Sequence, residues 1–148
     1  MARILGIDYG DRHLGLALSD PLQITAQPLG TYILKSEETE NQKYFRRLVE
    51  EKQVEEIVVG FPLRLDGTEG TRAELTRSFA AWLAKATGKK VILWDERWTT
   101  RQALRNLQGF KGNFKKKKQA EDQMAAVIIL EAYLEKKRQQ SDNESEDY

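Results

Sequence analysis

The sequence RILGIDYGDRHLGLALSD, residues 3–20, contains two short apolar runs separated by turn residues. Gly10 and Asp11 interrupt the apolar pattern, and the first run carries the carboxylate of Asp8 near its end. Short apolar runs joined by glycine and aspartate are typical of a β-hairpin. We therefore predict strands over residues 3–9 and 14–19, with an acidic side chain inside the hairpin.

After this hairpin, one further strand is expected, followed by an alternation of helices and strands. We predict a strand, helix, strand, helix, strand, short helix and long helix over residues 30–34, 36–53, 56–61, 71–87, 90–94, 99–107 and 119–138. Ser36 and the pair Thr71 and Glu74 are the expected helix caps, and Gly88 is expected to end the second helix. This order predicts three antiparallel strands followed by parallel βα units.

Length and composition limit the classes of protein that this chain can belong to. Its 148 residues suit one domain, and it contains no cysteine and a single histidine. Disulfides, cysteine nucleophiles and Cys/His zinc sites are thereby excluded, so we expect oxygen ligands for any metal. No apolar stretch approaches the roughly 20 residues of a membrane span. We expect a cytoplasmic protein with one domain over residues 1–139 and a disordered acidic tail over 140–148.

The formal net charge of +1 conceals a basic cluster late in the chain. This cluster consists of Lys111, Lys115, Lys116, Lys117 and Lys118. Phe110 and Phe114 lie among these lysines, an arrangement typical of segments that bind phosphates and stack bases. The alternative is a solvated lysine loop whose aromatic rings fold inward. We predict a flexible loop here that contacts nucleic acid.

Four segments in this order and spacing resemble the YqgF/RuvX family of Holliday junction resolvase-like proteins and pre-16S rRNA nucleases. They are GIDYGDRHLGLALSD (6–20), VGFPLRLDGTEG (59–70), DERWTT (95–100) and EDQMAAVIIL (121–130). The likeness covers residues 3 to about 136. It implies an α/β, RNase H-like fold whose mixed sheet has three antiparallel strands followed by parallel βα units, with helices on both faces.

The same resemblance implies three catalytic and metal-binding carboxylates. The first-strand aspartate of the family corresponds to Asp8, the glutamate of its Asp-Glu-Arg motif to Glu96, and its late-helix aspartate to Asp122. The related RuvC resolvases have a further acid at the position of Ala125 in this chain. Arg97, which directly follows Glu96, is expected to contact a phosphate of the nucleic acid.

Two neighbouring acids in the last predicted helix compete for the third position. Adjacent helix residues point about 100° apart, so Glu121 and Asp122 do not share a face. Asp122 shares its face with Ala125, Ala126 and Ile129, and small residues there let a helix approach a sheet closely. The helical spacing therefore favours Asp122.

Carboxylates in this pattern suit the hydrolysis of a phosphodiester bond. The reaction needs an activated water and a stabilised leaving oxygen, which two Mg²⁺ or Mn²⁺ ions supply together. Such hard ions prefer oxygen ligands. We predict a metal-dependent endonuclease acting on structured RNA, with precursor ribosomal RNA favoured, or on branched DNA. For the RNA substrate the expected role is processing of the 5′ end of pre-16S rRNA in ribosome biogenesis.

Alternative functions are compatible with the same residues. One is a Holliday junction resolvase in DNA recombination and repair, and another is a non-catalytic RNA-binding or transcription-associated factor. Sugar kinases and Hsp70-like ATPases use related folds, but they need two such domains around the nucleotide. In a further alternative, Asp8 and Glu96 only end strands and Asp122 only supplies first-turn helix charge. Neither the oligomeric state nor a partner protein follows from the sequence.

Overall fold

The computed structural model describes residues 2–64, 66–96 and 114–146, with side chains described for 2–64, 66–96 and 123–140. The strands are β1 (Arg3–Tyr9), β2 (His13–Ser19), β3 (Ala26–Ile33), β4 (Val54–Phe61) and β5 (Lys90–Asp95). The helices are α1 (Glu38–Glu51), α2 (Thr71–Thr87) and α4 (Phe114–Glu146). The predicted short helix over 99–107 lies outside the described residues.

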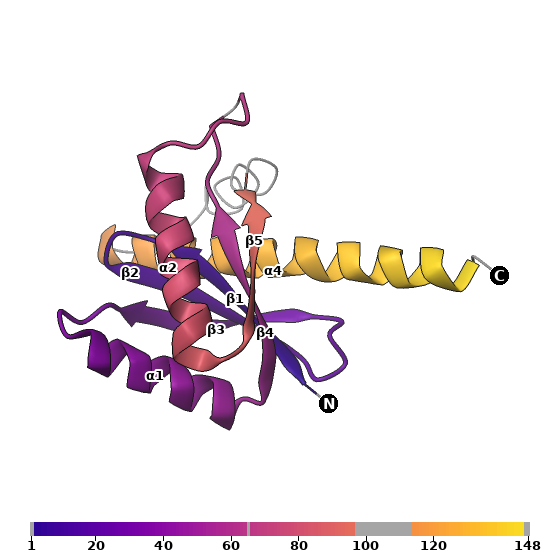
Figure 1. Ribbon diagram of the computed structural model, residues 1–148, viewed down its shortest axis with the longest axis horizontal. Coiled ribbons are helices and arrows are strands. Elements are labelled where there is room, and N and C mark those ends of the chain that lie inside the picture. Colours follow the sequence, from indigo (N-terminus) through magenta and orange to yellow (C-terminus); the bar gives the residue numbers. More distant parts are fainter. Residues whose placement is uncertain (1, 65, 97–113, 147–148) are drawn as a thin grey trace.

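The five strands form one mixed sheet in the order β3-β2-β1-β4-β5. β1 pairs with β2, and β2 with β3, in antiparallel fashion, whereas β1 with β4 and β4 with β5 are parallel. Helices α1 and α2 cover one face of the sheet, and α4 runs across the other (Figure 1). The predicted α/β architecture, with helices on both faces of a mixed sheet, is therefore confirmed.

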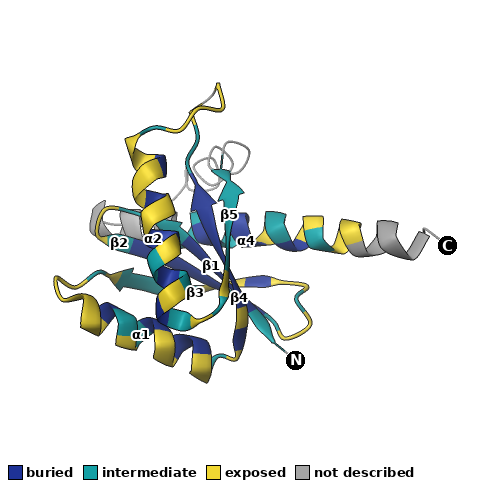
Figure 2. Ribbon diagram, viewed as in Figure 1, coloured by how far each residue is buried: buried dark blue, intermediate teal, exposed yellow. Residues whose placement is uncertain are grey.

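Successive side chains of a strand point to opposite faces, so β1 contributes to two hydrophobic cores. Leu5 and Ile7 are fully buried in the core under α1 and α2, whereas Ile4 is buried in the core under α4. Gly6 also faces α4, because a Cβ atom there would lie 2.9 Å from the Cβ atom of Leu130. The buried centre of the sheet between the helices is visible in Figure 2. By the same alternation, Asp8 belongs to the α4 face.

The end of the sheet where β1 begins anchors the middle of α4. The hydroxyl of Tyr133 donates a hydrogen bond to the carboxylate of Glu56, a residue of β4 that pairs with Ile4 at the start of β1. Lys137 lies 3.8 Å from the same carboxylate. Because residue 133 lies beside the start of β1, the earlier residues of α4 run toward the strand's end.

The third strand begins earlier than the sequence predicts. β3 starts at Ala26, whereas the prediction placed its start at about residue 30. The part that was not predicted contains Pro28. β3 is an edge strand, where a proline without an amide hydrogen is tolerated. The register shift between Leu16 and Ala17 leaves Leu29 without a partner on β2, which marks a β-bulge in β3.

The predicted cap of the first helix is wrong. The helix begins at Glu38 after Glu37, which makes no side-chain cap bond, so Ser36 is not the cap. The buried Asn41 instead holds the incoming chain. Its Oδ1 accepts a hydrogen bond from the amide of Lys35 at 2.9 Å, and its Nδ2 donates to the carbonyl of Lys35 at 3.0 Å. The helix therefore starts later than the serine indicated.

The predicted capping box of the second helix is also wrong, although its end is confirmed. Gly70 occupies the N-cap without a side-chain bond, and Thr71 is the first helical residue. The amide of Glu74 donates to the carbonyl of Gly70. At the other end, Gly88 adopts a left-handed conformation with φ of 70° and donates its amide to Ala84 at 2.9 Å. Glycine is preferred there because it has no Cβ atom.

The last helix extends beyond its predicted bounds of 119–138 at both ends. It begins at Phe114, so residues 115–118 are helical and not part of a flexible loop, in keeping with the high helix propensity of lysine. It continues to Glu146. Because side chains after residue 140 are not described, the division at residue 139 between domain and tail stays a prediction. No described helix is long and apolar enough to span a membrane.

Candidate metal and nucleic-acid site

Two predicted acids meet where β1 and β5 end. β4 lies between these two strands. Val59 of β4 pairs with Ile7 of β1. The next residue on each strand, Gly60 on β4 and Asp8 on β1, therefore lies at the same level of the sheet. A Cβ atom on Gly60 would lie 2.9 Å from both Cγ and Cδ of Glu96. The side chain of Glu96 therefore lies across Gly60, where any larger residue would displace it.

Asp8 and Glu96 are close enough for their side chains to share a hydrogen bond. Burial, followed by the charge of Asp8 and that hydrogen bond, raises the pKa of Glu96 from 4.5 to about 8, while Arg72 acts in the opposite direction. Asp95 adds a smaller upward contribution to the pKa. The fold thus holds two carboxylates together at a cost in electrostatic free energy, an arrangement common at functional sites.

Arg72 is a site residue that the sequence reasoning missed. It lies in the first turn of α2, where the helix dipole favours acids over cations. Its Nη1 is 2.5 Å from Oδ1 of Asp11, and its Nη2 donates to the carbonyl of Tyr9 at 3.1 Å. The sequence offered one indication of this role: an arginine in the first turn of a helix, directly after a loop that contains Gly67 and Gly70.

These residues line a depression of about 330 Å³ formed by residues 8–13 with Arg72 and Glu96. The tight turn between β1 and β2 forms its rim. Gly10 donates its amide to the carbonyl of His13 at 3.1 Å, and a Cβ atom on Gly10 would lie 2.5 Å from that oxygen. Only glycine fits this turn. The depression therefore combines paired acids with a cation at its edge.

The first part of α4 lies at the same level of the sheet as Asp8. The side chain of Gln123 donates to Oγ1 of Thr31 at 3.2 Å. Thr31 pairs with Gly15, and Gly15 pairs with Asp8. The backbone of Asp122, one residue earlier in α4, therefore belongs to the helix segment that passes this end of the sheet.

The structure places the other predicted site residues only in part. Arg97 and Lys111 lie outside the described residues, and the side chains of Asp122 and Lys115–Lys118 are likewise not described. Among the described side chains, no group of three or more acids or histidines is arranged to hold a metal ion. Asp8 and Glu96 are the predicted ligands that the structure brings together.

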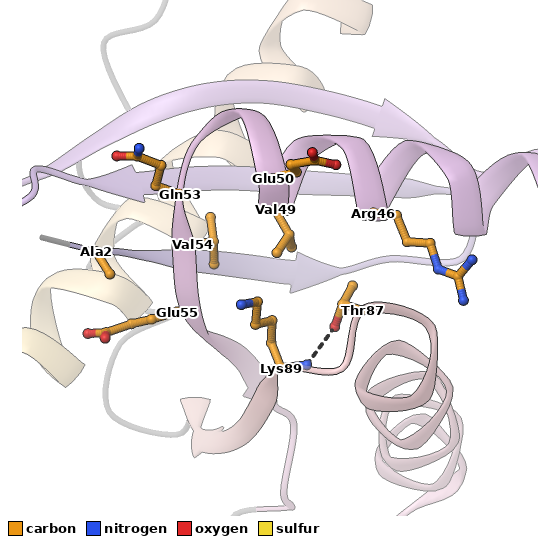
Figure 3. Close-up of a pocket in the computed structure, with 9 residues that line it drawn as sticks. All are labelled: Ala2, Arg46, Val49, Glu50, Gln53, Val54, Glu55, Thr87 and Lys89. Atoms are coloured by element: carbon orange, nitrogen blue, oxygen red, sulfur yellow. Dashed lines mark hydrogen bonds between the residues drawn. The ribbon is translucent and has the colours of Figure 1, made fainter.

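A larger cavity of about 570 Å³ lies away from these acids, at the opposite end of the sheet (Figure 3). It is formed by the end of α1, the start of β4 and the turn before β5. Arg46 there already donates its Nε to the carbonyl of Ala86 at 2.7 Å. Glu50 and Glu55 stand on different elements and extend from different sides of the cavity. This cavity lacks the paired carboxylates on which the chemistry depends.

The sheet topology and the paired acids define the class of the protein as RNase H-like. RuvC from Thermus thermophilus has this fold. Its structure in complex with a Holliday junction substrate is 15% identical to this chain, covers 93% of this chain and 96% of its own, and has a TM-score of 0.53. A second RuvC structure from the same organism has a TM-score of 0.51 at the same identity, covering 92% of this chain and 96% of its own.

The chain belongs to the RuvX family, whose model is described as "Holliday junction resolvase" and matches residues 2–136. A relative from Koribacter versatilis is 45% identical over 91% of this chain and 88% of its own length. One from Acetivibrio thermocellus is 46% identical over 91% of this chain and 96% of its own length. Both bear the name "Putative pre-16S rRNA nuclease". The family predicted from the sequence is thereby confirmed.

Replacing Asp8 with asparagine is expected to raise the thermal stability of the metal-free protein. The folded-state pKa of Glu96 is about 8 against a usual 4.5, so the folded form binds more protons between these values and loses stability as pH rises through them. Asp8→Asn removes one cause of this loss. We expect the melting temperature to rise most near pH 8, by about 4 °C for each ~1 kcal/mol gained.

A matched substitution elsewhere should have the opposite effect. Hydrogen bonds from the backbone of Thr25 and Ile24 keep the pKa of Asp20 low, so Asp20→Asn should lower the melting temperature at the same pH. Thermal unfolding followed by circular dichroism in chelator measures both. If Asp8→Asn melts at the same temperature as the unaltered protein at pH 8, or at a lower one, then repulsion between Asp8 and Glu96 does not destabilise the fold.

Proposed function

We propose that this chain is a metal-dependent endonuclease that hydrolyses phosphodiester bonds in structured nucleic acid. The observation that carries the proposal is the enforced pairing of Asp8 and Glu96 at the carboxyl ends of two strands. A binding protein needs no such pair, because like charges held together only reduce stability and repel phosphate. A bound divalent cation would offset both effects. It would also supply the activated water that hydrolysis needs, which gives the pair a function.

The donor set fits a hard divalent cation. Both side chains offer carboxylate oxygens, and the chain contains no cysteine that would favour a softer metal. Burial is the largest cause of the raised pKa of Glu96, and the negative charge of Asp8 adds to it, so a cation beside both carboxylates would offset their repulsion. Asp8 and Glu96 would hold Mg²⁺ or Mn²⁺, whose chemistry when bound is to activate water and stabilise a leaving oxygen.

Asp122 is the third ligand in this proposal. Its backbone lies in the part of α4 that Gln123 ties to Thr31, at the register of Asp8. It also precedes Ala126 by four residues, and the carbonyl oxygen of Ala126 would lie 3.2 Å from a Cβ atom on Gly6. Since residues four apart share a helix face, this spacing supports a place for Asp122 over the end of β1.

Arg72 supplies the phosphate contact on the opposite edge of the depression. Its side chain is 43% exposed, and the side chain of its ion-pair partner Asp11 is 85% exposed. An ion pair so open to water contributes little to stability, so a phosphate oxygen can replace Asp11 at small cost. The carbonyl of Tyr9 meanwhile keeps the guanidinium at the site. Arg97 and the basic cluster defined above are proposed to add further phosphate contacts.

The names of the relatives favour precursor 16S ribosomal RNA as the substrate, and hence a role in ribosome biogenesis. The family description favours a second candidate, the resolution of Holliday junctions in DNA. Both substrates are structured and carry a dense phosphate backbone, which the same site would engage. We propose the RNA substrate first, because both reported relatives carry that name, and a cytoplasmic location stays a prediction.

Replacing Glu96 with glutamine should abolish cleavage while leaving nucleic-acid binding intact. The change removes a ligand charge with little change in shape, whereas the cations that bind phosphate remain. Removing a residue that only hydrogen-bonds to a metal ligand lowers activity roughly 10–100-fold, and we expect the loss of cleavage activity in Glu96→Gln to be greater than that. The measurement is cleavage of precursor ribosomal RNA and of a four-way DNA junction in Mg²⁺ and Mn²⁺, beside a binding assay.

Glu50→Gln is the matched control, since this exposed carboxylate lines the cavity at the opposite end of the sheet. It should cut both substrates as the unaltered protein does. Equal cleavage by the Glu96→Gln and unaltered proteins would reject the proposed site. If no protein cuts either substrate in either metal, the non-catalytic binding factor becomes the better explanation.

Replacing Arg72 with alanine should weaken substrate binding and reduce its dependence on salt. Loss of one phosphate contact lowers the slope of log affinity against log salt concentration by about 1. Lys85→Ala is the charge-matched control, because Lys85 is an exposed residue in the last turn of the same helix. Binding curves over a range of salt concentrations distinguish the two. An identical slope for both variants would show that Arg72 does not contact phosphate.

A further inference from the structure

A second cleft of about 400 Å³ lies beside the depression that holds the paired acids and shares Tyr9 with it. We call it the Tyr9 cleft and define it by its apolar and aromatic walls: Tyr9, Leu34, Leu75, Phe79 and Trp82. It opens on the side of the sheet covered by α1 and α2. The end of β1 separates it from the carboxylates, which face α4.

The walls of the cleft include three aromatic rings that stack on one another, together with the exposed side chain of Leu75. The rings of Tyr9 and Phe79 stack with centroids 4.5 Å apart, and those of Phe79 and Trp82 stack at 5.9 Å. Leu75 is 48% exposed. A concave surface of this kind leaves apolar and aromatic area open to water beside a site built for phosphate. It therefore suits a flat, largely apolar group.

The polar residues that line the cleft are exposed to solvent or, in the case of Asn41, already hydrogen-bonded. Asn41, which also lines it, accepts hydrogen bonds from the hydroxyl of Tyr32 and the amide of Lys35. Lys35 and Glu38 lie at the mouth and are exposed. Among the described lining residues, the buried part of the cleft thus offers no charged group for an ionic ligand, and the two charges at its mouth are of opposite sign.

We propose that the Tyr9 cleft binds one unpaired nucleobase of the substrate strand, next to the phosphate held at Arg72. The inference rests on the proposed nuclease function and names how that site takes its substrate. Arg72 and Leu75 are three residues apart in α2, which is about 4.5 Å along the helix axis. Residues three apart share a helix face with β-carbons about 5–6 Å apart, so the phosphate and the base of a single nucleotide can reach both side chains.

Tyr9 joins the two parts of this site. Its carbonyl oxygen accepts the hydrogen bond from Arg72, while its ring forms the wall of the cleft. A paired base is not available to a concave pocket, so the substrate must present this nucleotide unpaired or flipped out of its helix. Recognition by stacking is tolerant of sequence, because every base has a flat face. The cleft therefore selects for a structural feature of the strand at the cut.

The test is an abasic scan of a bound strand. The probe is an RNA hairpin with a single-stranded extension of about ten nucleotides, which is within the length that proteins binding single-stranded nucleic acid contact. Single abasic nucleotides are placed at successive positions, and binding to the Glu96→Gln protein is measured by fluorescence anisotropy, so that the strand stays intact. We expect one position to lose about 10-fold in affinity, as loss of one stacked base does.

The variant Leu75→Ser should then bind the intact strand about 10-fold more weakly and show no further loss at that abasic position. Leu75→Gln, which keeps more of the side chain, provides a second version of the same test. Leu22→Ser is the matched control, because this leucine is 64% exposed between β2 and β3 and lies outside the cleft. It should retain both the full affinity and the abasic effect.

Three results would overturn the proposal for the Tyr9 cleft alone. Equal binding of all abasic strands would show that no base occupies a pocket, and an abasic effect retained by both Leu75 variants would place the base elsewhere. An equal loss in Leu22→Ser would show a general effect of removing surface leucines. Complete absence of binding to every strand would instead overturn the proposed function itself, and the Tyr9 cleft with it.

Discussion

The paired carboxylates of Asp8 and Glu96 are the constraint around which the rest of the structure is arranged. Asp8 lies on β1 and Glu96 directly follows β5, with β4 between these strands, and a Cβ atom on Gly60 of β4 would lie 2.9 Å from the carboxyl carbon of Glu96. Burial and mutual repulsion raise the pKa of Glu96 to about 8, so the pairing reduces the stability of the metal-free fold. Such a pairing persists only where the surrounding structure compensates for it.

That compensation comes from two cores on opposite faces of the sheet. One lies under α1 and α2 and contains fully buried side chains such as Ile7 and Phe45, and the other lies under α4 around Ile129 and Leu130. Gly6 lets α4 approach β1 closely enough to form the second core. Tyr133 and Gln123 then fix the direction of the helix through hydrogen bonds to different strands. The helix that supplies the proposed third ligand is thereby held in register.

The sequence predicted features that depend on local patterns or on the resemblance to a family. The hairpin around Asp8, the βα alternation, the end of α2 at Gly88 and the family itself are all confirmed. The structure also brings Asp8 together with Glu96, although their role in metal binding stays a prediction. These features were predictable because periodicity and glycine placement are encoded in neighbouring residues.

Features that depend on tertiary context were not predictable in the same way. The first residues of β3 were not predicted. They contain Pro28, which a strand tolerates at the edge of a sheet, and the edge position of β3 depends on which strands lie beside it. Ser36 had the residue type of a helix cap, but the side chain of Asn41, inside the helix, forms hydrogen bonds to both backbone groups of Lys35. Such a contact from within the helix cannot be predicted from the serine alone. Arg72 lies more than sixty residues from its partner Asp11, so its unusual place in the first turn of α2 could not show which residues it contacts.

The most direct test of this account is to locate a divalent metal in the protein. Crystals of the unaltered protein grown with Mn²⁺ would be examined for anomalous scattering from the ion. The account predicts Mn²⁺ held by oxygen atoms of Asp8 and Glu96, with a carboxylate oxygen of Asp122 completing the protein ligands. Mn²⁺ bound elsewhere, or no ion between Asp8 and Glu96 at saturating concentration, would contradict the central claim that this pair of acids exists to bind metal.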